Sequence, residues 1–279
     1  MPGEPPPDGD IGPDTRAFYR RILQILSESG TPFLVGGALA FEHYTGIERN
    51  TRDLDVFLRP MHRDQALERL DAAGEETEAS FPHWLAKVRS NADYVDLIFS
   101  SGNGLAEVDA EWFDYSTPAT ILDIQVDICP VEEMIWSKAF VMERERYDGA
   151  DVIHLIRACA AELDWDRLLG RFGAHWRVLL SHLVLFGFVY PGDRPVVPPR
   201  LLRELVTRLE REAATRDPGA PACLGTLISR QQYVVDLERW GYRDGRLPPT
   251  GRMTKEEIEA WTAAMLEDER RERLGITPA

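Results

Sequence analysis

The chain has 279 residues, too many for one minimal module and too few for three domains, so one large or two modest domains are expected. Hydrophobic residues make up 44% and charged residues 28%, which excludes collagen-like, coiled-coil and wholly disordered chains. The net charge of −15 is concentrated in residues 1–130, which hold 10 basic and 23 acidic residues, whereas residues 131–279 hold 22 and 24. The acidic first half disfavours general coating of nucleic acid and suits a carboxylate metal site.

Cysteine usage, the N-terminal segment and the longest apolar stretch bear on the compartment. The three cysteines show no paired CxxC spacing, so neither a disulfide framework nor a zinc knuckle is predicted, and a reducing cytoplasm fits best. Residues 1–13 are acidic and proline-rich, unlike a signal peptide, and predict a disordered tail. The longest apolar stretch, 178–190, contains a serine and a histidine, so we expect no membrane span and no membrane partner.

Residues 14–130 carry the pattern of a mixed α and β domain. Asp14 is expected to cap a helix that runs to about Ser29, where Gly30 stops it. A short apolar strand at 33–35 then leads into a glycine pair and a helix at 38–44. The other elements predicted in this half are a strand at 53–58, a helix at 62–73, and strands at 84–88, 94–99, around 121 and at 125–128.

After Pro130 the pattern changes to consecutive helices separated by proline and glycine turns. The helices are predicted at 131–146, 149–161, 164–171, 174–189, 199–214, 222–240 and 254–273. The expected architecture is therefore an α+β domain at 14–130 followed by a helical domain at 131–279.

The segment from Phe33 to Phe57 carries the chemistry. A strand that ends in Gly36-Gly37 and enters a helix leaves backbone N–H groups free at the helix N-terminus, where phosphate oxygens bind and glycine allows close approach. Asp53 and Asp55 are two residues apart on a predicted strand, so both carboxylates point from one face and can hold one or two hard cations. The glycine pair and the aspartate pair are each common by themselves. Their separation by one helix and one loop makes the combination much more specific.

Two divalent ions that bridge a triphosphate need a third acid. Asp96 is our candidate, because it lies between apolar residues in a predicted strand, where a carboxylate is expensive unless it faces a partner or a metal. Asp127 has the same pattern and is the rival, and Asp123 is weaker still.

These motifs resemble those of the DNA polymerase β-like nucleotidyltransferase superfamily, which combine a glycine turn, a Dx[DE] pair and a third acid on a neighbouring strand. Gly36-Gly37, Asp53-x-Asp55 and Asp96 match them in order, and the form of the match looks most like minimal bacterial and toxin-type (type IV toxin–antitoxin) nucleotidyltransferases. The resemblance covers about residues 30–155. It implies a mixed sheet with flanking helices, Mg²⁺ or Mn²⁺, and a nucleoside triphosphate (NTP) substrate; many members have serine where this chain has Gly37.

The same resemblance implies a nucleotide-binding lysine. Toxin-like relatives place a helix lysine, which contacts nucleotide phosphates, and a following aspartate where this chain has Lys138 and Asp151. The composition favours a role for Lys138 independently, because the chain uses 29 arginines and only three lysines. Asp148 is better explained as a cap of the next helix, and for Asp151 capping and a site role are equally balanced.

Arg49 and Arg52 border the aspartate pair, and we favour phosphate contact over simple charge balance for them. The predicted function is metal-assisted transfer of a nucleoside monophosphate from an NTP to an acceptor hydroxyl. The acceptor stays open among tRNA, a protein side chain and a small hydroxylated molecule. The alternative is a catalytically weak nucleotide-binding or partner-binding module, such as one component of a toxin–antitoxin pair with a small protein partner.

Overall fold

The computed structural model describes residues 11–49, 51, 53–90, 93–215 and 221–263. These fall into two compact units, one made of the described residues up to Pro130 together with 259–263, and the other of 131–258. A mixed sheet with helices precedes a mainly helical region, which confirms the expected α+β class. Of the predicted tail, residues 1–10 lie outside the described part, and Pro13 already belongs to the first helix.

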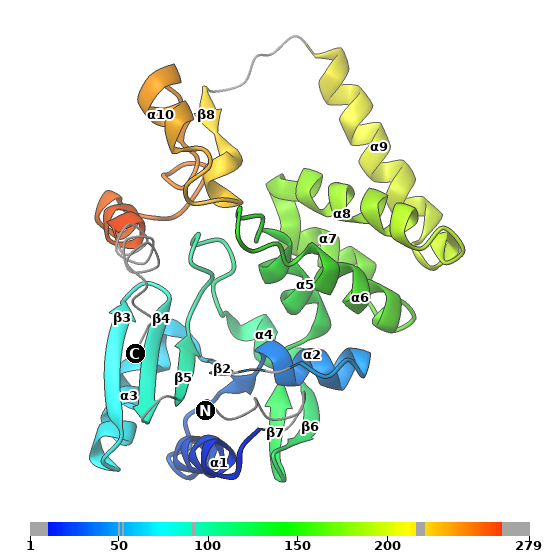
Figure 1. Cartoon of the computed structure of the whole chain (residues 1–279). Helices are drawn as coiled ribbons and strands as arrows, with labels where there is room; N and C mark the ends of the chain where they lie inside the picture. Colours follow the sequence, from blue (N-terminus) through cyan, green and yellow to red (C-terminus); the bar gives the residue numbers. More distant parts are fainter. Residues whose placement is uncertain (1–10, 50, 52, 91–92, 216–220, 264–279) are drawn as a thin grey trace, which may run out of the picture. The chain divides into compact units, whose positions relative to one another are not determined.

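The first unit is built around a seven-stranded mixed sheet with strand order β3-β4-β5-β2-β1-β7-β6 (Figure 1). Strand β2 runs parallel to β5 and antiparallel to β1, which in turn runs parallel to β7. The elements are α1 (Pro13–Glu28), β1 (Leu34–Val35), α2 (Gly37–Thr45), β2 (Asp53–Phe57), α3 (Arg63–Ala72), β3 (Glu76–Phe81), β4 (Leu85–Ser90), β5 (Asp93–Ile98), α4 (Ala110–Asp114), β6 (Thr117–Ile121) and β7 (Ile124–Ile128).

The central strands bury one face and leave the other open to polar side chains. Leu54 and Val56 of β2 are fully buried, as are Val95 and Leu97 of β5. The apolar side of α1 packs against α3 and β5. Because side chains alternate along a strand, the residues between these buried positions all project from the opposite face.

Several boundaries in this unit differ from the sequence-based prediction. Helix α1 begins at Pro13, so Asp14 lies in its first turn and Gly12 takes the capping position. Strand β3 was not predicted, because its sequence ETEASF has no apolar alternation; half of its residues are exposed and none is buried. An edge strand of this kind is held by its backbone ladder to β4, which leaves little signal in the sequence.

The described residues of the second unit form the helices α5 to α10 and a small two-stranded sheet. Its elements are α5 (Val131–Ala139), α6 (Gly149–Cys159), α7 (Trp165–Phe172), α8 (Trp176–Val189), α9 (Pro199–Ala214), β8 (Ala222–Cys223), α10 (Val234–Trp240) and β9 (Arg243–Asp244). Helix α5 ends at Ala139, seven residues before the predicted end. Beyond it the backbone N–H of Met142 donates to the Ile228 carbonyl oxygen instead of to a helix carbonyl, and the Glu143 side chain accepts hydrogen bonds from Ser229 and Arg230.

The predicted helix at 222–240 is wrong for its first half. Residues 222–223 pair with β9, a 3₁₀ turn follows, and only Val234–Trp240 is α-helical. The nearly buried Arg246 forms an ion pair with Asp244, which also accepts a hydrogen bond from Thr226. These tertiary polar contacts organise the segment and outweigh its helical periodicity.

In the described part of the chain, Trp165–Val189 is long and apolar enough to span a membrane by length and composition, and its most apolar 18-residue window has a mean hydropathy of 1.4. This is weak support for a span, since core helices pass the same test. The stretch comprises α7 and α8 joined by a 3₁₀ turn, and its fully buried His182 lies 2.9 Å from the Ala139 carbonyl oxygen through Nε2.

A buried ion-pair network joins α5 to α7. Glu133 is completely buried and accepts hydrogen bonds from Arg167 and, at 2.7 Å, from Arg171 Nε. Arg167 also donates to Glu132 at 2.7 Å. Burial raises the pKa of Glu133, while the charges of Arg167 and Arg171 oppose that shift. Each charge in the network is therefore tolerated because its partners are present.

Glu133→Ala should lower the free energy of unfolding by about 3–5 kcal/mol, because it leaves arginine charge buried without its main partner. Glu145→Ala is the control, since Glu145 is exposed and meets only Arg144 at 3.7 Å, and it should cost less than about 1 kcal/mol. Urea unfolding of both variants provides the comparison. Equal destabilisation would show that the network does not hold α5 against α7.

Candidate active site

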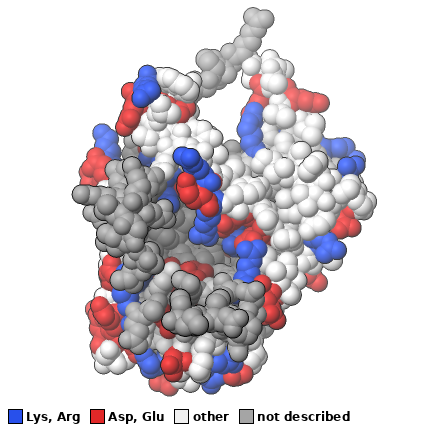
Figure 2. Space-filling view, in the orientation of Figure 1, with Lys and Arg blue, Asp and Glu red and all other residues white. Residues whose placement is uncertain are grey.

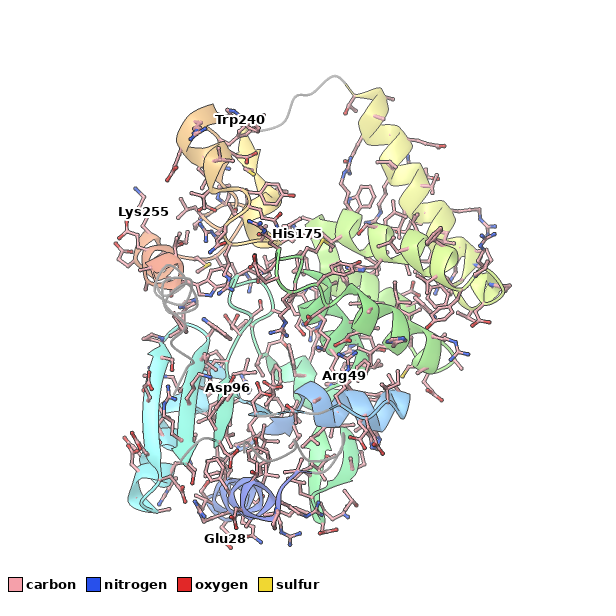
Figure 3. All side chains as sticks on the ribbon, in the orientation of Figure 1. Glu28, Arg49, Asp96, His175, Trp240 and Lys255 are labelled. Atoms are coloured by element: carbon pink, nitrogen blue, oxygen red, sulfur yellow. The ribbon has the colours of Figure 1, made fainter. Side chains whose placement is uncertain are left out.

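Three aspartates of the first unit bring their carboxylates together. Asp53 and Asp55 project from one face of β2, and Asp96 lies on β5 directly across from Asp55 in the parallel pair. One carboxylate oxygen of each lies within 4.8 Å of the other two, and all three residues are half-buried. Figure 3 labels Asp96 at its position on β5. The structure therefore joins the three acids that the sequence singled out.

The other two acids considered for the third position lie apart from this group. Asp127 is exposed on β7, and β1 separates β7 from β2. Asp123 is exposed in the turn between β6 and β7, where Arg16 and Arg20 each contact it at 2.8 Å. Its hydrogen bond to Arg16 and that residue's charge lower the pKa of Asp123, as expected for a surface ion pair. Geometry therefore favours Asp96.

The glycine pair fits closely against β2. Gly36 donates its N–H to the Asp55 carbonyl oxygen at 3.0 Å, so this group is not available to a phosphate. Gly37 has a left-handed φ of +57°, and a Cβ there would lie 1.7 Å from Asp55 Oδ2. A serine at Gly37, common among nucleotidyltransferases, would therefore strain the backbone and clash with a site carboxylate. The glycine is required by the position of Asp55.

Two site residues were missed by the sequence analysis. Thr51 donates its hydroxyl hydrogen bond to Asp53 Oδ1 at 2.6 Å and so orients that carboxylate. Lys87 on β4 donates from Nζ to Asp96 Oδ1 at 2.7 Å, and its Nζ lies 4.0 Å from the centre of the Tyr94 ring. The scarcity of lysine, which directed attention to Lys138, applies equally to Lys87 and was the signal that could have found it.

The charges of the three acids affect one another and a nearby tyrosine. Burial raises the pKa of Asp96, the charge and hydrogen bond of Lys87 oppose this shift, and the charge of Asp53 adds to it. Burial also raises the pKa of Tyr19 well above its usual value, with further contributions from Asp93 and Asp53. The site is thus a region of concentrated negative potential with one ammonium group against it.

The donor set suits a hard divalent cation. Mg²⁺ and Mn²⁺ prefer carboxylate and other oxygen ligands, and here three carboxylates present oxygens to one another at short range. Asp53, Asp55 and Asp96 are therefore the residues that would hold such an ion.

The comparisons with known proteins bear on this chemistry. The model of the family described as "Nucleotidyl transferase of unknown function (DUF2204)" matches residues 15–174, more than half of the chain. The chain belongs to this nucleotidyl transferase family. The matched region includes all three aspartates and both glycines. No curated protein matched the sequence.

Solved structures with a similar fold include several nucleotidyltransferases. The antibiotic-resistance factor ANT(2'')-Ia is 16% identical, with a TM-score of 0.45, over 62% of this chain and 98% of that one. An antigenic nucleotidyltransferase-like protein from Paracoccidioides brasiliensis is 16% identical, with a TM-score of 0.45, over 67% and 93%. JHP933 from Helicobacter pylori is 13% identical, with a TM-score of 0.37, over 73% and 97%. Similarity at this level does not carry a substrate from one protein to another.

In the second unit of this family member, the structure brings Lys138 and Asp151 together. Lys138 Nζ lies 2.9 Å from Asp151 Oδ2 and 3.4 Å from Asp148 Oδ2. Asp148 takes the capping position of α6, yet its side chain makes no capping hydrogen bond; it pairs with Arg146 at 2.9 Å instead. Although burial favours its neutral form, the Arg146 hydrogen bond and the Lys138 charge hold the pKa of Asp148 below its usual value. Asp148 therefore occupies the predicted capping position, but its side chain serves the ion pairs and does not cap the helix.

Of the two arginines that border the aspartate pair, the structure describes only Arg49. Arg49 places its guanidinium carbon 4.6 Å from the centre of the Phe41 ring, near the end of α2 (Figure 3). Arg52 lies outside the described residues. Phosphate contact stays a prediction for both.

The close fit of Gly37 against Asp55 gives a test of the site's construction. Gly37→Ala should cost about 1–3 kcal/mol more than Gly46→Ala at the other end of α2. Gly46 has a similar φ of +68° but open space around it, so its substitution reports backbone strain alone, about 1–2 kcal/mol. Chemical denaturation of the two variants gives the difference. Equal costs would show that the Asp55 contact does not constrain Gly37.

Proposed function

We propose that the chain transfers a nucleoside monophosphate from an NTP to an acceptor hydroxyl. The observation that carries the proposal is the convergence of Asp53, Asp55 and Asp96 beside the N-terminus of α2, which begins at Gly37. The chain belongs to a nucleotidyl transferase family, which supports the same reaction. In the reaction the acceptor oxygen forms a bond to the α-phosphorus, the bond between that phosphorus and the bridging oxygen breaks, and pyrophosphate leaves. The acceptor hydroxyl loses its proton.

The protein groups have distinct roles in this proposal. Asp53, Asp55 and Asp96 hold Mg²⁺ or Mn²⁺, which when bound neutralises phosphate charge and makes the α-phosphorus more open to attack. Asp96, on the β5 side of the group, is placed to accept the proton of the acceptor hydroxyl. The first-turn N–H groups of α2, beginning at Gly37, have no acceptors within the helix and are suited to phosphate oxygens.

The surface favours local over general recognition of the nucleotide. On the described atoms of the face shown in Figure 2, acidic and basic side chains are interspersed. With a net charge of −15, attraction of a triphosphate rests on individual groups rather than on a wide basic field. We assign Lys138 to this phosphate role, with Arg52 and Asp151 as further nucleotide-binding groups. A toxin-type role, a small protein partner and a cytoplasmic location also belong to the proposal.

The proposal is tested with the double variant Asp53→Asn/Asp55→Asn. In the wild type, Mg²⁺ should raise the melting temperature by several degrees, and Mg²⁺ with ATP should raise it further, because both bind the folded state. The variant should be at least as stable without metal, since charge repulsion is relieved, and it should lose the metal response and transfer from α-labelled NTP. An equal metal response from both proteins would exclude these acids as the metal site. Metal and nucleotide binding without transfer to tRNA, protein or small-molecule acceptors would instead support the binding-module alternative.

A second test addresses Lys138. Lys138→Ala/Asp151→Asn removes one positive and one negative charge, so the local charge balance is kept and folding should be preserved. The dissociation constant for NTP should rise by about 10-fold or more, as expected for the loss of a charged hydrogen bond to phosphate. Lys255→Ala is the control, because Lys255 is an exposed lysine elsewhere in the chain. Unchanged affinity in isothermal titration would leave Lys138 with a structural role only.

A further inference from the structure

Lys87 forms an ion pair with Asp96, one of the three aspartates that converge in the candidate site. It is directly across from Asp96 in the antiparallel pairing of β4 with β5, and Asp55 lies across from Asp96 on the other side. The three side chains therefore form a row over three strands, Lys87–Asp96–Asp55. Lys87 and Asp96 are mostly shielded from solvent, with side-chain exposures of 20% and 14%.

The neighbours of Lys87 direct it to Asp96 rather than to another acid. Glu78 on β3 lies across from Lys87 on its other side, but Glu78 pairs with Arg89 at 2.8 Å. The Tyr94 ring lies 4.0 Å from the ammonium group and fixes it by a cation–π contact. Lys87 is thus held against a single oxygen of Asp96.

The choice of lysine matters at this position. The chain contains 29 arginines and only three lysines, so a lysine at this position is unusual for this chain. An arginine beside a carboxylate commonly binds both oxygens with its planar fork, whereas an ammonium group acts as a single point charge. Lysine can therefore fix Asp96 through Oδ1 and leave the other oxygen for a metal ion or an acceptor hydroxyl.

We propose that Lys87 is a positioning residue that orients Asp96 for nucleotidyl transfer by occupying one carboxylate oxygen and leaving the second free. The proposal rests on the proposed function, since it assigns Asp96 a metal and an acceptor proton. It differs from a purely structural role for the ion pair, which arginine would fill equally well.

Two substitutions separate these roles through Mn²⁺ binding, measured by electron paramagnetic resonance without nucleotide. Lys87→Met removes a positive charge beside the site, so Mn²⁺ should bind as tightly as in the wild type or more tightly. Lys87→Arg keeps the ion pair and the melting temperature, but Mn²⁺ should bind roughly 10–100-fold more weakly because both Asp96 oxygens are engaged. Weaker Mn²⁺ binding in Lys87→Arg, with no weakening in Lys87→Met, is the signature of positioning.

Turnover at saturating Mg²⁺ and NTP provides the second readout. In Lys87→Met, kcat should fall by roughly 10–100-fold with little change in KM for NTP, because Asp96 loses its orientation while the α2 phosphate site is intact. Arg89→Met is the matched control: it removes a cation from the same strand and face, but one that pairs with Glu78, and it should keep near wild-type turnover.

The outcomes separate failure of this proposal from failure of the proposed function. If Lys87→Arg matches the wild type in Mn²⁺ affinity and turnover, or if Lys87→Met keeps full kcat, the positioning role is wrong and the ion pair is structural. If Lys87→Met loses Mn²⁺ binding together with thermal stability, the same conclusion holds. If the wild type itself binds no Mn²⁺, the proposed function fails, and the role of Lys87 fails with it.

Discussion

The first unit must hold three carboxylates within 4.8 Å of one another. At an effective dielectric constant of about 20, two unit charges at that separation repel by about 3 kcal/mol. The pairing of β2 with β5 resists this repulsion, because the opposite face of these two strands packs into the core. Leu54, Val56 and Leu97 on that face are fully buried. Burial of one such side chain contributes about 1.5–3 kcal/mol, so one or two of them offset the repulsion of one pair.

Residues next to the three acids accommodate the repulsion between their charges. Gly37 lets the start of α2 approach Asp55 with no side chain between them. Thr51 donates a hydrogen bond to Asp53. Lys87, on the neighbouring strand β4, partly compensates the charge of Asp96. Each acid therefore has its own neighbour on the first unit. Three carboxylates at short range are suited to a divalent cation, which is consistent with the nucleotidyl transferase family to which the chain belongs.

Local patterns made the main features of the site predictable from the sequence. The alternation of Asp53-Leu54-Asp55-Val56 indicates a strand with one polar face. Asp96 lies between apolar residues, which indicates a carboxylate that faces a partner or a metal ion. What the sequence does not contain is strand order. The contact of Lys87 with Asp96 depends on the pairing of β4 with β5, and Asp127 lies apart from Asp53 and Asp55 because β1 separates β7 from β2.

The errors in the second half have a similar cause. Residues 131–146 and 222–240 were predicted as helices from periodicity, but Glu143 bonds to residues 229 and 230, far away in sequence. Buried polar contacts between distant segments have no periodic signature, so they override the pattern without warning. By contrast, α9 was predicted at its observed bounds, because its apolar stripe and its proline start are local.

The central claim is that Asp53, Asp55 and Asp96 form one divalent metal site. Crystals soaked in Mn²⁺ test it most directly, by anomalous diffraction at the manganese absorption edge. The account predicts a strong anomalous peak with oxygens of all three aspartates as ligands. A peak elsewhere on the protein with none among these carboxylates, at a Mn²⁺ concentration that supports binding in solution, would contradict it.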